Sequence, residues 1–302
     1  MLPTIAYSKI DELDAVTITS ADYRATVLLQ GAQLIHFSTR MNDDHNNWLW
    51  VSEKAEYKTG ESVRGGIPIC WPVFGQFSAN PEAVQESFKD CKLDLKQHGF
   101  ARTQNFNMVM FNPLHVDHQL QHYASLTLQL PELKDFHPKL SLQVKFLFNA
   151  DHFHISLITT NHSKQTINFS QALHTYLPAI DITQSYIYGL SKVPYTDTLD
   201  KWETKTQQGN VTFSEGVDRI YHGAPNITLN TPAQTYHLQA KGSNSTVVWN
   251  PWIEKAKQVS QFAADDYQRM LCIETANAHL DSVTLEAGES HELRLTMCVL
   301  PF

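Results

Sequence analysis

Apolar and polar residues alternate along much of this chain, most regularly over residues 126–130, 140–146, 153–157 and 293–299. A period of two is typical of β-strands, because successive side chains of a strand point to opposite faces of a sheet. Turn-forming residues separate these runs, as in Asn149-Ala150-Asp151. The pattern predicts antiparallel strands that each bury one face.

Helical periodicity is weak by comparison. No long amphipathic helix is evident, and short helical turns are expected only at 53–57 and 263–269. The polar segment 79–94 is predicted to be an exposed insertion. Because no low-complexity linker and no fixed-period repeat divides the chain, we expect a single domain over residues 1–302 that folds as one large all-β sandwich.

Composition narrows the class of protein. The 302 residues carry a formal net charge of -8 without a stripe of Lys and Arg, which disfavours nucleic acid as a partner. The longest apolar runs are far shorter than a membrane span, and the start lacks the features of a signal peptide. The 4 cysteines are widely scattered, which indicates free thiols rather than a disulfide framework. We therefore expect a cytoplasmic protein, without a membrane partner, and a monomer.

Two segments about thirty residues apart stand out from the strand pattern: Arg64-Gly65-Gly66-Ile67-Pro68 with its continuation to Gly75, and Gln97-His98-Gly99-Phe100-Ala101-Arg102. Each places an arginine beside glycines, where the backbone can turn tightly or let a ligand approach closely. An arginine fork also matches the geometry of a phosphate. These segments favour a loop-built pocket for a polar ligand with apolar faces, such as a sugar. The alternative is two buried turns whose arginines pair with nearby carboxylates.

Two side chains are suited to proton transfer. If residues 167–177 form a strand, His174 shares a face with Asn168, Ser170, Ala172 and Tyr176, a surface that is polar but carries few charges. Histidine titrates near neutral pH, although an ordinary strand histidine is the alternative. Glu274 is a lone carboxylate in an apolar run, where burial would raise its pKa toward that of a general base. The alternative is a glutamate at a strand end that faces water.

Other candidates are weaker. Asp218 could accept hydrogen bonds from substrate hydroxyls or simply cap its own turn. Trp249 and Trp252 flank an Asn-Pro turn and could stack on a sugar or lie in the core. His115, His118 and His122 are close in sequence, but no cysteine or carboxylate set completes a metal site around them.

Taken in order, these motifs resemble the aldose 1-epimerase (mutarotase) superfamily, and most closely its hexose-6-phosphate mutarotase branch. The matching residues are the two Arg-Gly segments, Leu173-His174-Thr175-Tyr176, Asp218-Arg219, Trp249-Asn250-Pro251 and Glu274-Thr275-Ala276, which cover nearly the whole chain. The resemblance implies a galactose-mutarotase-like β-supersandwich and no cofactor. It implies that His174 is the general acid and Glu274 the general base.

The same resemblance assigns substrate contacts. His98 and Asp218 would hold substrate hydroxyls or the region of the ring oxygen, and Arg64 and Arg102 would face a 6-phosphate. Lys96 and Gln97 are further candidate contacts for the phosphate. The expected reaction is α–β anomer interconversion of a hexose 6-phosphate, with two proton-transfer groups on opposite sides of the hemiacetal. No metal or redox cofactor is needed for it.

Three alternatives stay open. A mutarotase of free galactose or glucose would not need the two arginines, and a non-catalytic carbohydrate-binding protein would not need His174 and Glu274 together. A glycoside hydrolase would require two carboxylates that flank a bond, which leaves His174 without a role.

Overall fold

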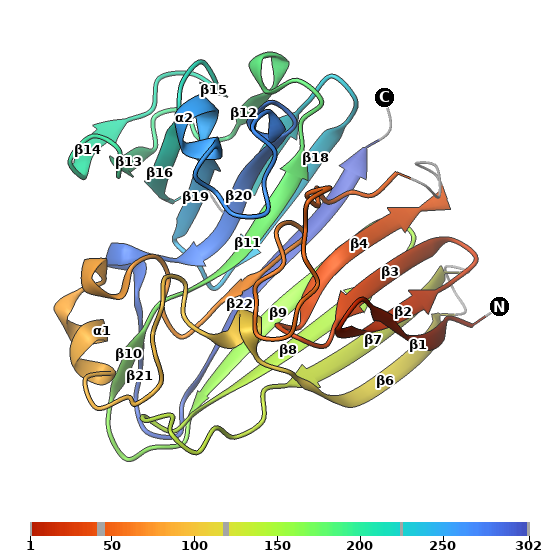
Figure 1. Ribbon diagram of the computed structural model, residues 1–302, viewed down its shortest axis with the longest axis vertical. Coiled ribbons are helices and arrows are strands. Elements are labelled where there is room, and N and C mark those ends of the chain that lie inside the picture. The colour runs from red at the N-terminus through yellow and green to blue at the C-terminus, as the bar shows by residue number, and fades with distance from the viewer. Residues whose placement is uncertain (1, 41–45, 117–120, 224–225, 301–302) are drawn as a thin grey trace.

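The computed structural model describes residues 2–40, 46–116, 121–223 and 226–300. Within these ranges the chain forms sheets of nine, seven, four and two strands, and its helices are short (Figure 1). The prediction of an all-β sandwich is confirmed. The four strands expected from alternation are present, and all belong to the nine-stranded sheet.

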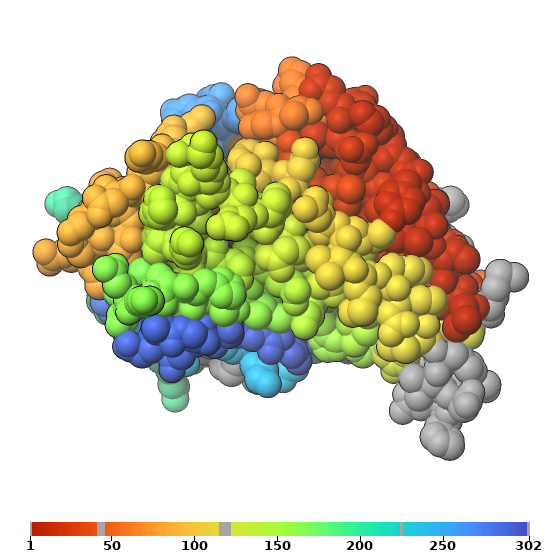
Figure 2. Space-filling view, turned by 90° about the horizontal axis from the view of Figure 1, so that it is seen from below, coloured from red at the N-terminus to blue at the C-terminus, as the bar shows by residue number. Residues whose placement is uncertain are grey.

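The nine-stranded sheet combines the middle of the chain with its C-terminal strand. The strands follow the order β15 (Val211–Thr212), β12 (Tyr186–Tyr188), β17 (Asn226–Asn230), β18 (Thr235–Lys241), β22 (Ser290–Leu300), β9 (Phe153–Asn161), β8 (Leu140–Phe148), β7 (Gln121–Gln129) and β6 (Asn107–Val116). Every neighbouring pair is antiparallel. Seen from below, the yellow and green middle part of the chain lies between its red N-terminal part and its blue C-terminal part (Figure 2).

The seven-stranded sheet holds the predicted site residues. Its order is β14 (Glu203–Thr206), β13 (Pro194–Asp197), β16 (Val217–His222), β19 (Ser245–Asn250), β20 (Met270–Asn277), β11 (Gln171–Pro178) and β5 (Ile69–Cys70). The four-stranded sheet contains β1 (Thr4–Ile10), β2 (Leu13–Thr19), β3 (Tyr23–Leu28) and β4 (Gln33–Thr39), and the two-stranded one pairs β10 (Ile167–Phe169) with β21 (Val283–Leu285).

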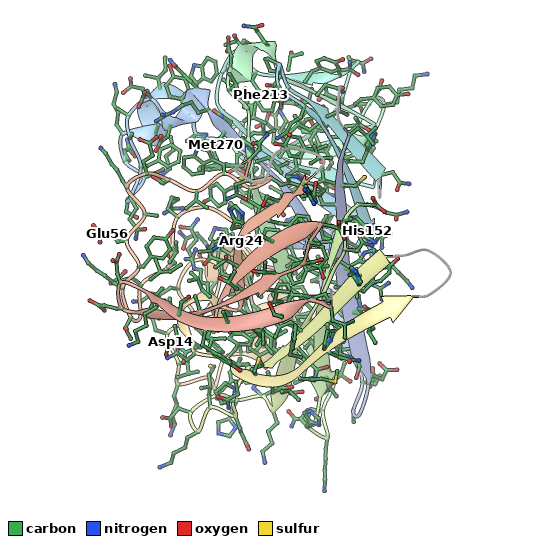
Figure 3. The ribbon with its side chains drawn as sticks, turned by 90° about the vertical axis from the view of Figure 1, so that its right-hand side faces the viewer. Asp14, Arg24, Glu56, His152, Phe213 and Met270 are labelled. Atoms are coloured by element: carbon green, nitrogen blue, oxygen red, sulfur yellow. The ribbon has the colours of Figure 1, made fainter. Side chains whose placement is uncertain are left out.

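One large core joins these sheets. Phe37 on β4 lies 5.7 Å from Phe148 and 5.1 Å from Phe153, measured between ring centroids, so the four-stranded sheet packs on the inner face of the nine-stranded one. Leu173 of β11 and Ile273 of β20 belong to the same cluster of buried side chains. Figure 3 shows the four-stranded sheet from outside, with Arg24 on it and Met270, the first residue of β20, above it.

The predictions for the helical segments were only partly right. Residues 53–57 form a turn and no helix, whereas 263–269 contains the 3₁₀ turn η5 (Asp266–Gln268). The segment 79–94 is not simply an exposed insertion, because α1 (Glu82–Ser87) and the residue after it bury Val84 and Phe88 in the core. Other helical elements of the described residues are α2 (Trp252–Ala256), η2 (Phe77–Ala79), η3 (Ala101–Thr103), η4 (Ile182–Gln184) and η6 (His279–Asp281).

The segment expected as one strand over 167–177 is two strands, interrupted at Ser170. The hydroxyl of Ser170 accepts a hydrogen bond from the backbone N–H of Phe74 and donates one to Asn80. These contacts hold the chain where it passes from one sheet to the next. The predicted facing of β11 is confirmed, since Leu173 and Leu177 enter the main core and His174 lies on the other face.

Candidate active site

The two Arg-Gly segments meet beside β11 at the edge of the seven-stranded sheet. The backbone carbonyl of Trp71 accepts hydrogen bonds from the N–H groups of Phe100 and Ala101, at 3.1 and 3.2 Å. Gly99 has a φ of 68°, and a Cβ there would lie 2.2 Å from the Trp71 carbonyl oxygen. Glycine is therefore required for this close backbone approach.

The first segment is also bound directly to β11. The N–H groups of His174 and Tyr176 donate to the carbonyls of Pro68 and Gly66, at 3.0 and 2.9 Å. Gly66 has a φ of 63°, and a Cβ would lie 2.3 Å from the Leu34 carbonyl oxygen. These contacts bring Arg64 to the same end of the sheet as His174.

His174 and Glu274 form a buried pair. They are directly opposite each other in the antiparallel register of β11 and β20, and Nε2 of His174 lies 3.3 Å from Oε1 of Glu274. His174 is 9% exposed and Glu274 is 2% exposed. The two groups thus lie in direct contact, and not on opposite sides of a bound hemiacetal as the sequence led us to expect. Adjacent groups suit a hemiacetal, whose hydroxyl and ring oxygen are both bonded to C1.

Burial shifts the two pKa values in opposite directions. It raises the pKa of Glu274 well above its ordinary value, and the carboxylate of Asp218 raises it further. Burial lowers the pKa of His174 to about 3, with Arg64 and Arg102 adding to the effect. Both shifts favour the uncharged forms, a protonated Glu274 beside a neutral His174.

His98 has a defined tautomer. The backbone N–H of Gly75 donates to its Nδ1 at 3.3 Å, so in the neutral ring the proton is on Nε2. Desolvation lowers the pKa of His98 well below its ordinary value, which keeps the ring neutral. Its ring meets that of His174 edge-on at 5.5 Å. His98 is thus a neutral hydrogen-bond donor beside the pair.

The two arginines have different surroundings. Arg64 donates through Nη1 to the Tyr176 hydroxyl at 2.9 Å, and through Nε and Nη2 to the carbonyl and hydroxyl of Ser260, at 3.2 and 3.4 Å. Arg102 makes one hydrogen bond, from Nη2 to the carbonyl of Gln97 at 2.7 Å. Within the described ranges neither guanidinium has a carboxylate within ion-pairing distance. This differs from the alternative of two buried Arg–carboxylate turns.

Gln97 lies at the rim of the site. Its side chain is exposed and accepts a hydrogen bond from Gln76 at 3.3 Å, while its backbone carbonyl orients Arg102. The structure therefore gives the backbone of Gln97 a clearer part in the site than its side chain.

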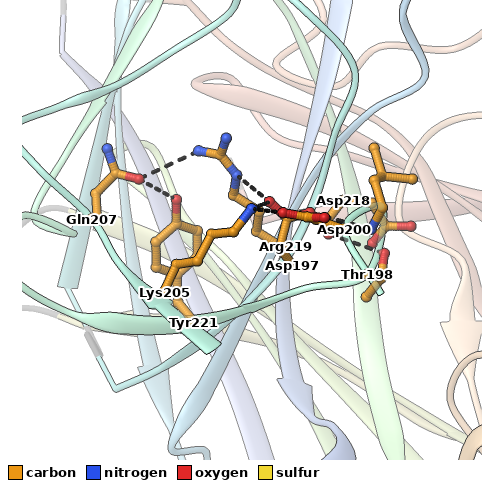
Figure 4. A network of polar contacts seen from close by, with 9 residues as sticks. Asp197, Thr198, Asp200, Lys205, Gln207, Asp218, Arg219 and Tyr221 are labelled. Carbon is orange, nitrogen blue, oxygen red and sulfur yellow. Dashed lines mark hydrogen bonds and ion pairs between the residues drawn. The ribbon is translucent and has the colours of Figure 1, made fainter. Parts of the chain in front are cut away.

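Asp218 and Arg219 point to opposite faces of β16. Asp218 is paired with Trp249 of β19 and lies on the same face of the sheet as Glu274. Burial raises the pKa of Asp218, and the nearby Thr198 hydroxyl partly offsets that shift. Arg219 instead enters a network on the other face, 4.0 Å from Asp197, whose carboxylate also binds Lys205 at 3.0 Å (Figure 4). Arg219 is therefore a structural residue, although it is adjacent to Asp218 in the chain.

Beside the His174–Glu274 pair lies a cluster of buried small and apolar side chains, which includes Cys70, Ala172, Ile220, Val247 and Ala276. All four cysteines are free, as predicted, and burial raises the pKa of the Cys70 and Cys272 thiols, which keeps them protonated. Trp249 approaches the His174 ring edge-on at 6.1 Å.

Two residues of the site were missed in the sequence. Tyr176 was placed on the face of His174 but received no role, and Ser260 carries no local signal, because it is an exposed loop residue that reaches the site only through the fold.

A family model described as "Aldose 1-epimerase" matches residues 14–298, nearly the whole chain. The chain belongs to the aldose 1-epimerase family. The resemblance noted in its motifs is thereby confirmed, and so is the mutarotase class of enzyme.

Relatives of this family member carry a narrower name. This chain is 30% identical over 288 residues to "Putative glucose-6-phosphate 1-epimerase" of Cenchrus ciliaris, with 92% of this chain and 82% of the relative covered. It is 28% identical over 284 residues to a protein of the same name from Escherichia coli K12, with 91% and 87% covered.

Solved structures support the fold. The chain superposes on a crystal structure of "a putative mutarotase" from Salmonella typhimurium with a TM-score of 0.83 at 22% identity, covering 99% of this chain and 94% of that one. A galactose mutarotase-like protein from Lactobacillus casei gives a TM-score of 0.68 at 16% identity, covering 95% and 100%. At these identities the likeness establishes the galactose-mutarotase-like fold alone.

Two cavities of the described part of the chain lie away from the paired His174 and Glu274. A cavity of about 400 Å³ is lined by Trp48, His152 and His154 among others, and one of about 500 Å³ by residues between Gln129 and His162. Neither includes the paired His174 and Glu274.

The described residues contain no group of three or more His, Cys, Asp or Glu side chains that could hold a metal ion. Of the three histidines considered above, His118 lies outside those residues. No helix in the described part of the chain is both long and apolar enough to span a bilayer.

Proposed function

We propose that this family member interconverts the α and β anomers of hexose 6-phosphates, with glucose 6-phosphate as the first substrate to test. The observation that carries the proposal is a pair of arginines, Arg64 and Arg102, beside an acid–base pair without net charge. Neither arginine is neutralised by a carboxylate within the described ranges, although the chain as a whole has a net charge of -8. A neutral sugar offers no charge to balance them, whereas a phosphate does.

Ring opening moves two protons. Glu274, as carboxylate, accepts the proton of the anomeric hydroxyl, and the O–H electron pair becomes the second bond of the C1 carbonyl. The C1–O5 electron pair moves to O5, which takes the proton of His174. Rotation about C1–C2 presents the other carbonyl face, and ring closure reverses both transfers. Each transfer is expected to contribute on the order of 10²–10⁴-fold to the rate.

The pKa shifts of the pair favour the protonation state that follows ring opening over the one that precedes it. Before ring opening the shared proton is on His174, and afterwards a proton is on Glu274 and His174 is neutral. The second state is the one that burial favours for both groups. Movement of one proton across the 3.3 Å contact relates the two states, so no proton has to enter from solvent.

The remaining side chains would orient the sugar. His98 would donate from Nε2 to a ring or hydroxyl oxygen, and Asp218 would accept from a hydroxyl. Arg102, with one of its five N–H donors engaged, would be the main contact for the phosphate. Remote binding of this kind fixes orientation without taking part in the chemistry.

The test is the rate of α-to-β exchange of glucose 6-phosphate by NMR, with free glucose and free galactose measured in parallel. Acceleration of the phosphate ester that disappears in Glu274→Gln, with the circular dichroism spectrum unchanged, is expected. Acceleration of the free sugars alone would remove the phosphate from the proposal and leave a free-aldose mutarotase. Absence of any acceleration would leave a sugar-binding protein.

A further inference from the structure

The proposed catalytic histidine, His174, is not held through Nδ1 by the side chain of another described residue. A catalytic histidine is commonly held by a hydrogen bond at the ring nitrogen that does not react. Nδ1 of His174 is buried, and within the described residues it finds no hydrogen-bond partner on another residue; the backbone of His174 itself is the only such group that affects its pKa. Packing against neighbouring side chains is therefore the remaining way in which other residues on the Nδ1 side can fix the plane of the ring.

Aromatic rings surround His174 instead. Tyr176 lies parallel to it, with ring centroids 4.9 Å apart and an angle of 17° between the planes. His98 and Trp249 meet it edge-on, at 81° and 71°. Of these three rings, only that of Tyr176 lies parallel to the imidazole, and it belongs to the same strand two residues further on, where side chains share a face.

Tyr176 is itself held from several sides. It is 2% exposed and stacks against Trp50, with centroids 5.7 Å apart and an angle of 26°. Its hydroxyl accepts the hydrogen bond from Arg64, whose Nε donates to the carbonyl of Ser260. Burial raises the pKa of Tyr176 to about 12, so the phenol stays neutral. The ring is thus fixed before substrate binds.

We propose that Tyr176 is a positioning residue, whose ring holds the imidazole of His174 in the plane that directs Nε2 at Glu274 and at the ring oxygen of the sugar. The hydroxyl of Tyr176 joins this ring to Arg64. This inference rests on the proposed function of the His174–Glu274 pair. It assigns the orienting role to the aromatic face of Tyr176 and not to its hydroxyl.

The ring and the hydroxyl can be separated by substitution. Tyr176→Phe keeps the ring and loses the bond to Arg64, and Tyr176→Leu loses both. In glucose 6-phosphate exchange, Tyr176→Leu should lower kcat on the order of 10²-fold with little change in KM, because a small misplacement of a catalytic group has effects of that size. Tyr176→Phe should restore most of kcat. Unchanged kcat in Tyr176→Leu, or equal losses in both variants, would overturn the proposal.

A second measurement does not depend on turnover. The ring protons of His174 should be shifted upfield by the stacked ring, in wild type and in Tyr176→Phe, and should move downfield in Tyr176→Leu; a resonance that is the same in all three proteins would refute the stack. If wild type shows no exchange activity, the proposed function fails while this measurement still decides the orientation. The assignment comes from the signals lost in His174→Gln.

A matched control separates positioning from general destabilisation. Tyr236 is fully buried on β18, and its hydroxyl is hydrogen-bonded to Gln234. Tyr236→Leu should lower the melting temperature as Tyr176→Leu does, without the loss of kcat and without a shift of the His174 resonances. A kcat loss in the control as large as in Tyr176→Leu would show a structural effect only and contradict the positioning role.

Discussion

Replacing Arg102 by Met removes the side chain best placed to bind a phosphate while retaining most of its aliphatic stem. Among the described residues Arg102 donates one of its five N–H groups, to the Gln97 carbonyl, which leaves four donors for a ligand. Hydrogen bonds to charged groups contribute about 1.5–3 kcal/mol each. At 1.4 kcal/mol per factor of ten, kcat/KM for glucose 6-phosphate should fall by roughly 10- to 100-fold.

The assay compares two substrates and one inhibitor. Turnover of whichever free sugar the wild-type protein accepts should change far less than turnover of the phosphate ester, and the inhibition constant of inorganic phosphate should rise with the KM of the ester. Arg24→Met provides the control, because Arg24 is exposed on β3 and its loss changes the net charge equally. An equal loss for the ester and the free sugar, or no loss for either, would refute the assignment of Arg102 to the phosphate.

Three further predictions concern stability, pH and backbone geometry. Because the pKa of Glu274 is raised in the folded protein, the free energy of unfolding should fall as pH rises from the unfolded-state pKa of 4.5 toward the raised folded-state pKa. Glu274→Gln should therefore be more stable than wild type at pH 7 and equal to it in acid. Urea unfolding at several pH values tests this, and the same pH dependence of stability in both proteins would contradict it. Since the Asp218 carboxylate raises the pKa of Glu274, Asp218→Asn should move the alkaline limb of the kcat profile to lower pH, and an unmoved limb would show that the two groups are not coupled. Gly99→Ala should lower both the melting temperature and turnover, because the added Cβ would lie 2.2 Å from the Trp71 carbonyl oxygen. The control is Gly209→Ala, which has a similar φ of 66° but no atom within 4 Å of the added Cβ, and which should show only the backbone cost of about 1–2 kcal/mol. Equal effects at both positions would exclude the steric argument.

Local pattern was sufficient for the strands and insufficient for the short segments between them. The alternation over 140–146 predicted β8 because a buried strand face requires apolar residues at every second position. The segment 79–94 is polar overall, and only two of its side chains, Val84 and Phe88, anchor the region of α1 in the core. Two apolar residues are too few to produce a recognisable helical period. The turn at 53–57 has helix-forming residues but no stripe of apolar ones to pack.

In the candidate site, too, the local sequence pattern predicted some features and not others. His174 and Tyr176 could be placed on one face from the period of the strand, and the glycines beside Arg64 and Arg102 indicated close backbone contacts. That Arg219 faces away from the site also follows from alternation once Asp218 faces toward it.

What the sequence determined by itself was therefore the class of fold, the facing of individual strands and the residue types that could carry proton transfer and bind an anion, because these depend on the two-residue period and on side-chain chemistry. Only the tertiary structure decided that Glu274 lies opposite His174, that Arg64 is engaged by Tyr176 and Ser260, and that Arg102 remains largely free. Those relations join residues up to 196 positions apart. They depend on strand register and loop packing, for which no short stretch of the chain carries a signal.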